Sequence, residues 1–247
     1  DAYYHFGDYH KAVASFRNYL EKENTPRRDA LYMLGLSYFQ TGVFSKAAET
    51  LGEVTTESDA LTQNAYLHMG LAYLHLAEKN KARMAFEQAA ASNAKYAEMV
   101  SSYLVEVYMN TRSYEAALKS IDRIAHPGKR ILEAKQRILF QLGTQAFANT
   151  QFEQAIGYFD RSLGLGQYNR QTKADALYWR GEAYYRLNRM EEAKRNFTDY
   201  LQLTQQTHNE MYALAHYNLG YIAFHQKDYT QAQNWFRKYI SLEKGEN

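Results

Sequence analysis

Histidine is the residue type in this sequence that could most readily bind a metal, and it occurs eight times. In a helix, His68 and His75 would share one face, but their spacing separates them by about 10 Å along the axis. That distance is too long for both rings to ligate one ion, and no carboxylate follows at the spacing of the zinc hydrolases. The absence of cysteine also excludes disulfides, thiolate zinc sites and a cysteine nucleophile. We therefore predict no metal site and no cofactor.

Two other short motifs have an ordinary structural explanation. Residues 162–168 contain two glycines but lack the lysine of a phosphate-binding loop and a preceding strand, so we interpret them as a turn. Residues 196–198 match a glycosylation acceptor, yet they lie in the middle of a predicted helix. No set of nucleophile, base and acid is recognisable along the sequence. We predict that the protein is not an enzyme.

The composition is typical of a folded, mostly helical chain. Lysine and arginine number 29 against 27 acids, and the net charge of +2 is too balanced for a nucleic-acid coat or a polybasic membrane patch. Only 2 of 247 residues are proline, 46% are apolar, and the mean hydropathy is −0.62. No apolar run approaches the roughly 18 residues that cross a bilayer, so we expect no transmembrane segment.

The elements that would position any site follow a repeat. Alanines recur at intervals of 35 residues in the first half and 38–39 in the second: Ala12, Ala47, Ala82, Ala117, Ala155, Ala193 and Ala232. A glycine precedes five of them by twelve residues: Gly35, Gly70, Gly143, Gly181 and Gly220. Seven units of about 35–39 residues indicate a repeat architecture.

Each unit has the periodicity of two helices joined by a turn. In the second unit, apolar or small residues occupy positions 31, 34, 35 and 38, which share one helix face. After a short turn, positions 44, 47, 51 and 54 form a second apolar face. Small residues on both helices allow close approach, which predicts an antiparallel helical hairpin. Since one hairpin cannot bury its own apolar face, neighbouring hairpins must stack.

The order of these residues resembles the tetratricopeptide repeat (TPR). The segments Gly42–Ala47 and Lys227–Ala232, the second followed by Phe236, carry the resemblance, which covers essentially the whole chain. It implies an all-α fold, a right-handed α-solenoid of about seven TPR-like antiparallel helical hairpins. The chain departs from the family in its longer spacing and in lacking most of the prolines that close a repeat. Long spacings are similar to those of bacterial cell-envelope TPR proteins, which implies a bacterial cell envelope or periplasm location, with the cytoplasm as the alternative.

We expect residues 1–247 to form a single TPR solenoid. The strongest break is His126-Pro127-Gly128, because proline and glycine together end a helix. A bend at 126–128 would separate repeats 1–4 from repeats 5–7, and a longer loop in a continuous solenoid is the alternative.

The resemblance also implies a binding surface. In the family, the first helix of each hairpin lines a concave groove that receives an extended peptide or a partner helix. The groove positions lie three residues before, one after and four after the helix glycine. The candidate binding residues are Tyr32, Leu36, Phe39, Leu71, Glu106, Phe140, Phe147, Tyr178, Glu182, Tyr185, Tyr217, Tyr221 and Phe224. These aromatics could instead pack between adjacent first helices.

The predicted function is that of a non-catalytic protein–protein interaction scaffold, which binds a peptide or partner segment in this aromatic groove. One alternative is a single-stranded RNA-binding helical-repeat protein. However, the balanced charge and the aromatic groove positions lead us to expect no nucleic acid. A peptide-sensing regulatory TPR protein is the other alternative.

The two ends of the sequence suggest further contacts. The first repeat has little of its leading helix, and no helix follows the apolar stripe that includes Trp235 and Tyr239. A solenoid usually needs polar capping helices. We therefore expect either a piece of a longer protein or end-to-end self-association through Trp235 and Tyr239.

Overall fold

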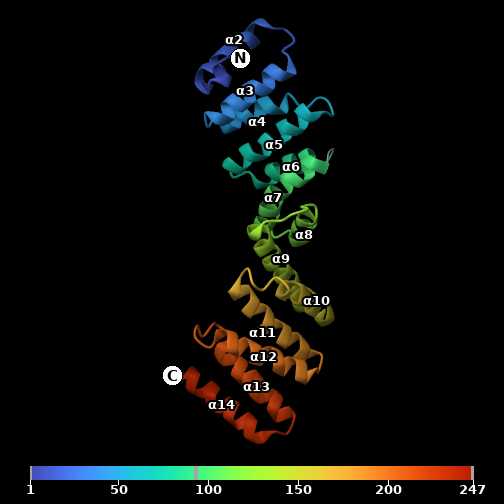
Figure 1. The fold of residues 1–247 in the computed structure, drawn as a ribbon, viewed down its shortest axis with the longest axis vertical. Helices are drawn as coiled ribbons and strands as arrows, with labels where there is room; N and C mark the ends of the chain where they lie inside the picture. The colour runs from blue at the N-terminus through green and yellow to red at the C-terminus, as the bar shows by residue number, and fades with distance from the viewer. Residues whose placement is uncertain (1, 92–93, 246–247) are drawn as a thin grey trace. The chain divides into compact units, whose positions relative to one another are not determined.

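The computed structural model describes residues 2–91 and 94–245, and all regular secondary structure in them is helical (Figure 1). The all-α prediction is therefore confirmed. Helices pair in sequence order into seven hairpins, each of which joins an odd-numbered helix to the even-numbered helix after it. No helix among these residues is long and apolar enough to span a membrane.

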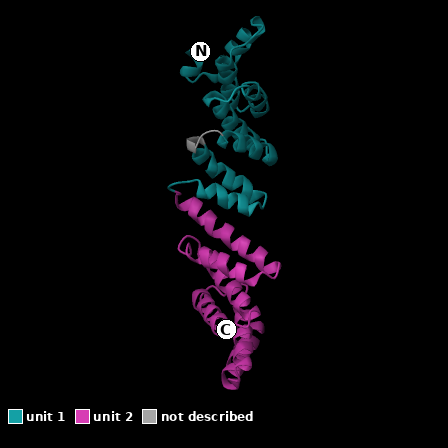
Figure 2. Ribbon diagram, turned by 90° about the vertical axis from the view of Figure 1, so that its right-hand side faces the viewer, with its two compact units in different colours: residues 1–126 teal, residues 127–247 magenta. Residues whose placement is uncertain are grey.

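The chain divides into two compact units, residues 1–126 and residues 127–247 (Figure 2). The boundary falls between His126 and Pro127, and the bend expected at 126–128 stays a prediction. Unit 1 contains four hairpins, formed by α1 (Ala2–His5), α2 (Tyr9–Lys22), α3 (Arg28–Gln40), α4 (Phe44–Gly52), α5 (Ala60–His75), α6 (Lys79–Ala90), α7 (Ala94–Asn110) and α8 (Tyr114–Asp122). Unit 2 contains three, formed by α9 (Lys129–Ala148), α10 (Phe152–Leu163), α11 (Arg170–Arg186), α12 (Met190–Thr204), α13 (Tyr212–His225) and α14 (Tyr229–Glu243).

The repeating alanines are buried where the two helices of each hairpin meet. All seven are at most 3% exposed: Ala12, Ala47, Ala82, Ala117, Ala155, Ala193 and Ala232. The repeating glycines lie against a large side chain of the second helix. A Cβ on Gly70 would approach Phe86 to 2.5 Å, and a Cβ on Gly143 would approach Phe159 to 2.5 Å. A larger residue at either glycine would therefore push the two helices of its hairpin apart.

The fourth hairpin closes without a glycine. Val105 of α7 stands at the glycine position and is 2% exposed. Sixteen residues later, where other hairpins carry Phe86 or Phe159, this hairpin carries Ile121, which is also buried. The larger residue on the first helix is thus matched by a smaller one on the second, because a close-packed interface tolerates swaps that conserve volume.

Each hairpin turn contains one residue in the left-handed conformation, five positions before the repeating alanine. These residues have φ between 56° and 77°: Gly7, Gly42, Ala77, Arg112, Thr150, Asn188 and Lys227. Glycine adopts this conformation freely, whereas a residue with a Cβ is strained in it. The turn geometry is therefore repeated even where the sequence does not favour it.

The loops between hairpins are held differently in the two units. In unit 1, the Arg28 guanidinium donates to the Asp59 carboxylate at 2.7 Å and to the Val54 carbonyl at 2.8 Å. Asp59 also caps α5 by accepting from the Thr62 N–H at 2.9 Å. In unit 2, Asn169 caps α11 in the same way, but its backbone carbonyl accepts from the Gln136 amide at 2.9 Å. The loop in unit 1 is thus held by the Arg28–Asp59 ion pair, whereas the loop in unit 2 is held by the neutral amide of Gln136.

Candidate functional site

A candidate binding surface lies in unit 2, on the first helices of its last two hairpins. A small open cavity of about 270 Å³ is lined by residues of α11 and α13: Glu182, Tyr185, Tyr217, Asn218 and Tyr221. Residues three or four positions apart share one face of a helix, which explains why Glu182 and Tyr185, and separately Tyr217 and Tyr221, point to the same side. We call these five residues the tyrosine pocket.

A hydrogen-bond network fixes the polar side of the tyrosine pocket. The Asn218 Nδ2 donates to Glu182 Oε1 at 2.7 Å and to the Tyr178 hydroxyl at 3.2 Å. The Tyr178 hydroxyl itself donates to Glu182 Oε1 at 2.9 Å. Burial raises the pKa of Tyr178, and the neighbouring Glu182 carboxylate raises it further, so the hydroxyl keeps its proton and remains a donor. Hydrogen bonds from Tyr178 and Asn218 therefore fix the position of the Glu182 side chain.

The aromatic side of the tyrosine pocket stays partly open to solvent. The Tyr185 and Tyr221 ring centroids are 6.1 Å apart at an interplanar angle of 65°, and Tyr217 stacks on Tyr221 at 6.3 Å and 27°. Tyr217 and Tyr221 remain 40% and 39% exposed, and nearby Phe224 is 54% exposed. Burial and the adjacent Tyr221 raise the pKa of Tyr185, which keeps its phenol neutral. Exposed tyrosine rings offer a large apolar contact area with a polar tip.

The other candidate residues of unit 2 lie within its packing. Phe140 lies 5.9 Å from the Phe159 ring. Phe147 contacts Phe152 at 5.1 Å and Trp179 at 5.3 Å. Tyr178 is only 1% exposed, so it supports the tyrosine pocket from the core instead of lining it as predicted.

The candidate aromatic residues of unit 1 pack against histidines. Tyr32 lies 6.4 Å from the His68 ring, and Phe39 lies 5.9 Å from His68 and 5.8 Å from His75. The His75 ring also stacks on Phe44 at 4.1 Å. These histidines therefore make aromatic contacts, and residues 2–91 and 94–245 contain no group of three or more His, Asp or Glu side chains that could hold a metal ion.

The remaining candidates of unit 1 do not form a common pocket with these rings. Leu36 is 8% exposed and belongs to the core, in contrast to its predicted position on the groove. Leu71 is half-buried on α5, and Glu106 is exposed on α7.

Three family models of the tetratricopeptide repeat match this sequence. One matches residues 1–65 and 140–194, another matches residues 63–96, and the third matches residues 213–245. Together the matches cover well over half of the chain. The chain belongs to the tetratricopeptide repeat family.

Several solved TPR structures are similar to the chain at low sequence identity. The C-terminal part of a TPR repeat-containing protein from Cytophaga hutchinsonii is 14% identical, with a TM-score of 0.47, and the match covers 99% of this chain and 94% of that one. YrrB, a TPR protein with an unusual peptide-binding site, is 19% identical, with a TM-score of 0.48, and the match covers 81% of this chain and 92% of that one. The TPR2AB domain of yeast Sti1, in complex with pHSP90, is 13% identical, with a TM-score of 0.49, and the match covers 96% of this chain and 85% of that one. No curated protein matches the sequence.

The TPR position rule finds four of the five residues of the tyrosine pocket and misses Asn218. This residue lies two positions before Gly220, a position that the rule does not assign to the groove. The sequence does contain a signal for this residue, because Asn218 is the one asparagine in the otherwise largely apolar α13. A polar amide in such a helix needs a hydrogen-bond partner, and its partner here is Glu182.

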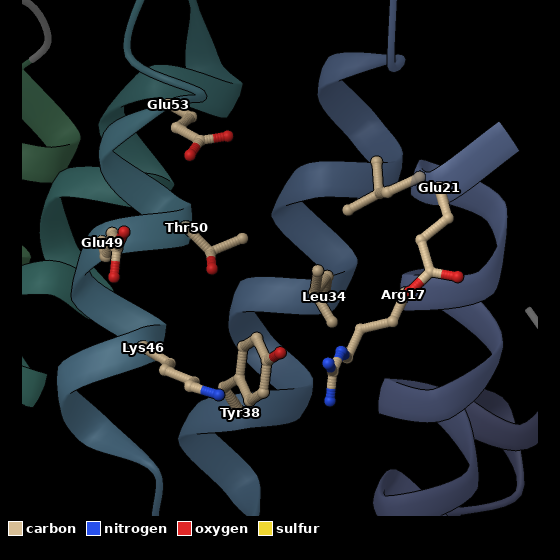
Figure 3. Close-up of a pocket in the computed structure, with 9 residues that line it drawn as sticks. Arg17, Glu21, Leu34, Tyr38, Lys46, Glu49, Thr50 and Glu53 are labelled. Carbon is tan, nitrogen blue, oxygen red and sulfur yellow. The ribbon is translucent and has the colours of Figure 1, made fainter. Parts of the chain in front are cut away.

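A second cavity, of about 380 Å³, lies in unit 1 and has a different character (Figure 3). It opens between the second helices α2 and α4, with Leu34 and Tyr38 of α3 at its base. Its rim carries both signs of charge, from Arg17, Glu21, Lys46, Glu49 and Glu53. The Lys46 amine lies 5.8 Å from the centre of the Tyr38 ring, so the TPR hairpin already supplies a cation to this aromatic side chain.

The residues predicted to mediate self-association pack within the last TPR hairpin. The half-buried Trp235 lies 5.7 Å from the His216 ring, and Tyr239 lies 5.4 Å from Tyr217. End-to-end self-association through Trp235 and Tyr239 stays a prediction.

Proposed function

We propose that the chain is a non-catalytic TPR scaffold that binds an extended segment of a partner protein across α11 and α13. The observation that supports this proposal is the tyrosine pocket, where the Tyr217 and Tyr221 rings stay partly exposed while most other candidate aromatics are engaged in packing. Tyrosine offers contact area and a hydrogen-bonding tip at little conformational entropy cost, so it suits recognition of a peptide. TPR proteins serve in general as interaction modules, and the YrrB structure is described as having a peptide-binding site.

The size of the tyrosine pocket favours a protein segment over a small metabolite. Sites that enclose a small molecule usually span about 300–1,000 Å³ and surround most of its surface. At about 270 Å³ and open to solvent, this cavity accommodates one side chain of a longer ligand. The Glu182 carboxylate at its edge would repel the phosphates of RNA, which disfavours the nucleic-acid alternative. The cell-envelope location stays a prediction from the family resemblance.

Site-specific photo-crosslinking in the source cells tests this function. Benzoylphenylalanine in place of Tyr221 should crosslink a partner, whereas the same group at Thr198, exposed on α12, should not. The purified partner should then bind the Tyr185→Ala/Tyr217→Ala variant at least about tenfold more weakly, since well-packed aromatics dominate binding at such surfaces. Equal crosslinking at both positions, or undiminished binding by the double variant, would show that the proposal is wrong.

A further inference from the structure

We propose that the tyrosine pocket recognises the guanidinium group of an arginine side chain on the partner segment. This inference rests on the proposed function and specifies the chemistry of its ligand. It depends on three properties of the pocket: the acceptor atoms that no described residue uses, a carboxylate without an ion pair among those residues, and the arrangement of the rings.

Among the residues that the structure describes, the network beneath the pocket leaves two acceptor atoms without a hydrogen-bond partner. Both hydrogen bonds to Glu182 fall on Oε1, one from Asn218 and one from Tyr178. A carboxylate only accepts, so the Asn218 amide must direct its nitrogen toward Glu182 and its Oδ1 away from it. Among the described residues, neither Glu182 Oε2 nor Asn218 Oδ1 takes part in a hydrogen bond. A ligand that fits this side of the pocket must therefore bring donors.

The pocket also contains a carboxylate that forms no ion pair among the described residues. Glu182 is the charged residue that lines the cavity, and it forms no ion pair with any described residue. The nearest base along the helix, Arg186, lies 5.7 Å from the Phe147 ring and 6.0 Å from the Phe152 ring. Its guanidinium is thus engaged with α9 and α10. A carboxylate beside neutral tyrosine rings favours a cation, which the ring faces attract as well.

The shape of the pocket selects arginine among the cations. The Tyr217 and Tyr221 rings lie at 27° to each other, Tyr185 is inclined to Tyr221 by 65°, and all three residues line the cavity of about 270 Å³. A guanidinium is planar, stacks on aromatic faces and presents several donors in a fixed fork. It can donate to Glu182 and Asn218 together while it lies on a ring. A lysine ammonium lacks the flat surface and the fork.

Unit 1 supplies a matched control. Glu106 occupies the same TPR position as Glu182, one residue after Val105 or Gly181, and it is exposed on α7. However, Ser102 and Met109 stand where unit 2 has Tyr178 and Tyr185. Glu106→Gln therefore removes the same charge from an equivalent helix position that has no tyrosine pocket.

The test is an NMR titration of the intact chain with ring-labelled tyrosines and the capped peptides Gly-Gly-X-Gly-Gly. With X as arginine, the signals of Tyr185, Tyr217 and Tyr221 should shift. Citrulline, which keeps the shape but not the charge, should bind about tenfold more weakly, because hydrogen bonds between charged partners are the stronger ones. Glu182→Gln should weaken arginine binding by a similar factor, whereas Glu106→Gln should leave it unchanged. The citrulline arm leaves the protein untouched, so misfolding of a variant cannot explain its result.

Three results would overturn the inference and leave the proposed function standing. These are lysine or leucine peptides that bind the pocket more tightly than arginine, equal binding of citrulline and arginine, and full binding by a folded Glu182→Gln variant. Absence of any shift with the arginine peptide also overturns it. The crosslinking experiment at Tyr221 does not depend on the identity of the side chain and decides the proposed function separately.

Discussion

The first helices of the two units carry aromatic residues at the same TPR positions but use them differently. In unit 1, Phe39 is surrounded by the rings of Phe44, His68 and His75. In unit 2, Phe224 stands at the same position, four residues after its helix glycine, and is 54% exposed. A residue's place in the repeat therefore does not decide its role. The side chains on the neighbouring helix decide whether an aromatic ring stabilises the stack or remains available for a ligand.

The largest expected effect concerns the packing between the two helices of a hairpin, where unit 2 pairs Gly143 with Phe159 and unit 1 pairs Val105 with Ile121. Gly143→Val should destabilise unit 2 by about 3 kcal/mol, because the added side chain collides with buried Phe159. Adding Phe159→Ile copies the Val105 and Ile121 pair of unit 1 and should recover part of the loss. Urea denaturation followed by tryptophan fluorescence measures this, since both tryptophans, Trp179 and Trp235, lie in unit 2. An unchanged unfolding midpoint in Gly143→Val would contradict the packing described here.

The second prediction compares the truncation of one aromatic residue in each unit, which should affect stability in unit 1 and partner binding in unit 2. Phe39→Ala should destabilise unit 1 by about 2 kcal/mol, since it removes the ring that holds His68 and His75. Tyr221→Ala should cost less than about 1 kcal/mol because its ring is partly exposed, yet it should abolish partner capture. Denaturation followed by circular dichroism, together with a binding assay, separates the two effects. If Phe39→Ala binds poorly while fully stable, the contrast between the units disappears.

A third prediction uses pH to compare the loops between hairpins. The Arg28 guanidinium, followed by the Thr62 N–H, holds the pKa of Asp59 well below its usual range. A carboxyl group with a lowered pKa stabilises the fold above its unfolded value of about 3.9, and the contribution is lost as pH falls through the folded value. Acid should therefore weaken unit 1 through Asp59, and Asp59→Asn should flatten this part of the profile.

Asp228→Asn is the matched control for the pH experiment. Asp228 also caps a helix, α14 in unit 2, by accepting from the Gln231 N–H, but no arginine pairs with it among the described residues. Stability below pH 5, measured by circular dichroism, should depend less on this substitution than on Asp59→Asn. The opposite ranking would show that the Arg28 ion pair does not carry the acid sensitivity.

The smallest expected effect concerns the turns within hairpins. Gly42 in unit 1 and Thr150 in unit 2 both adopt left-handed backbone angles, with φ of 77° and 60°. Thr150→Gly should stabilise unit 2 by up to about 1 kcal/mol, because it relieves strain at a β-branched residue. Gly42→Thr should destabilise unit 1 by a similar amount. Thermal denaturation measures both changes, and a loss of stability in Thr150→Gly would refute the assigned turn strain.

The sequence predicts the hairpins well because their closure depends on small residues at fixed spacing. The alanines and glycines occupy buried contact positions, and few other residues could replace them there. Whether an aromatic side chain at a groove position is buried or exposed depends instead on its contacts with other helices. Tyr178 and Tyr217 both lie three residues before a helix glycine and pack against equivalent rings of the second helix. However, Tyr178 also contacts Asn218 of the next hairpin and is 1% exposed, whereas Tyr217 is 40% exposed. Such contacts join residues that are distant in sequence, so one sequence does not reveal them.

The left-handed turn residues constrain how the length of this chain can vary. From the helix glycine through the turn to the repeating alanine the spacing stays at twelve residues, although the whole repeat grows from 35 to 39. One inserted residue in this stretch would move a different side chain onto the left-handed position and rotate the next helix by about 100°. We therefore expect insertions and deletions to be tolerated better between hairpins than within this stretch. Tags, reporter domains or new connections are best introduced there, for example within residues 205–209, where one added segment leaves every glycine–alanine pair in register.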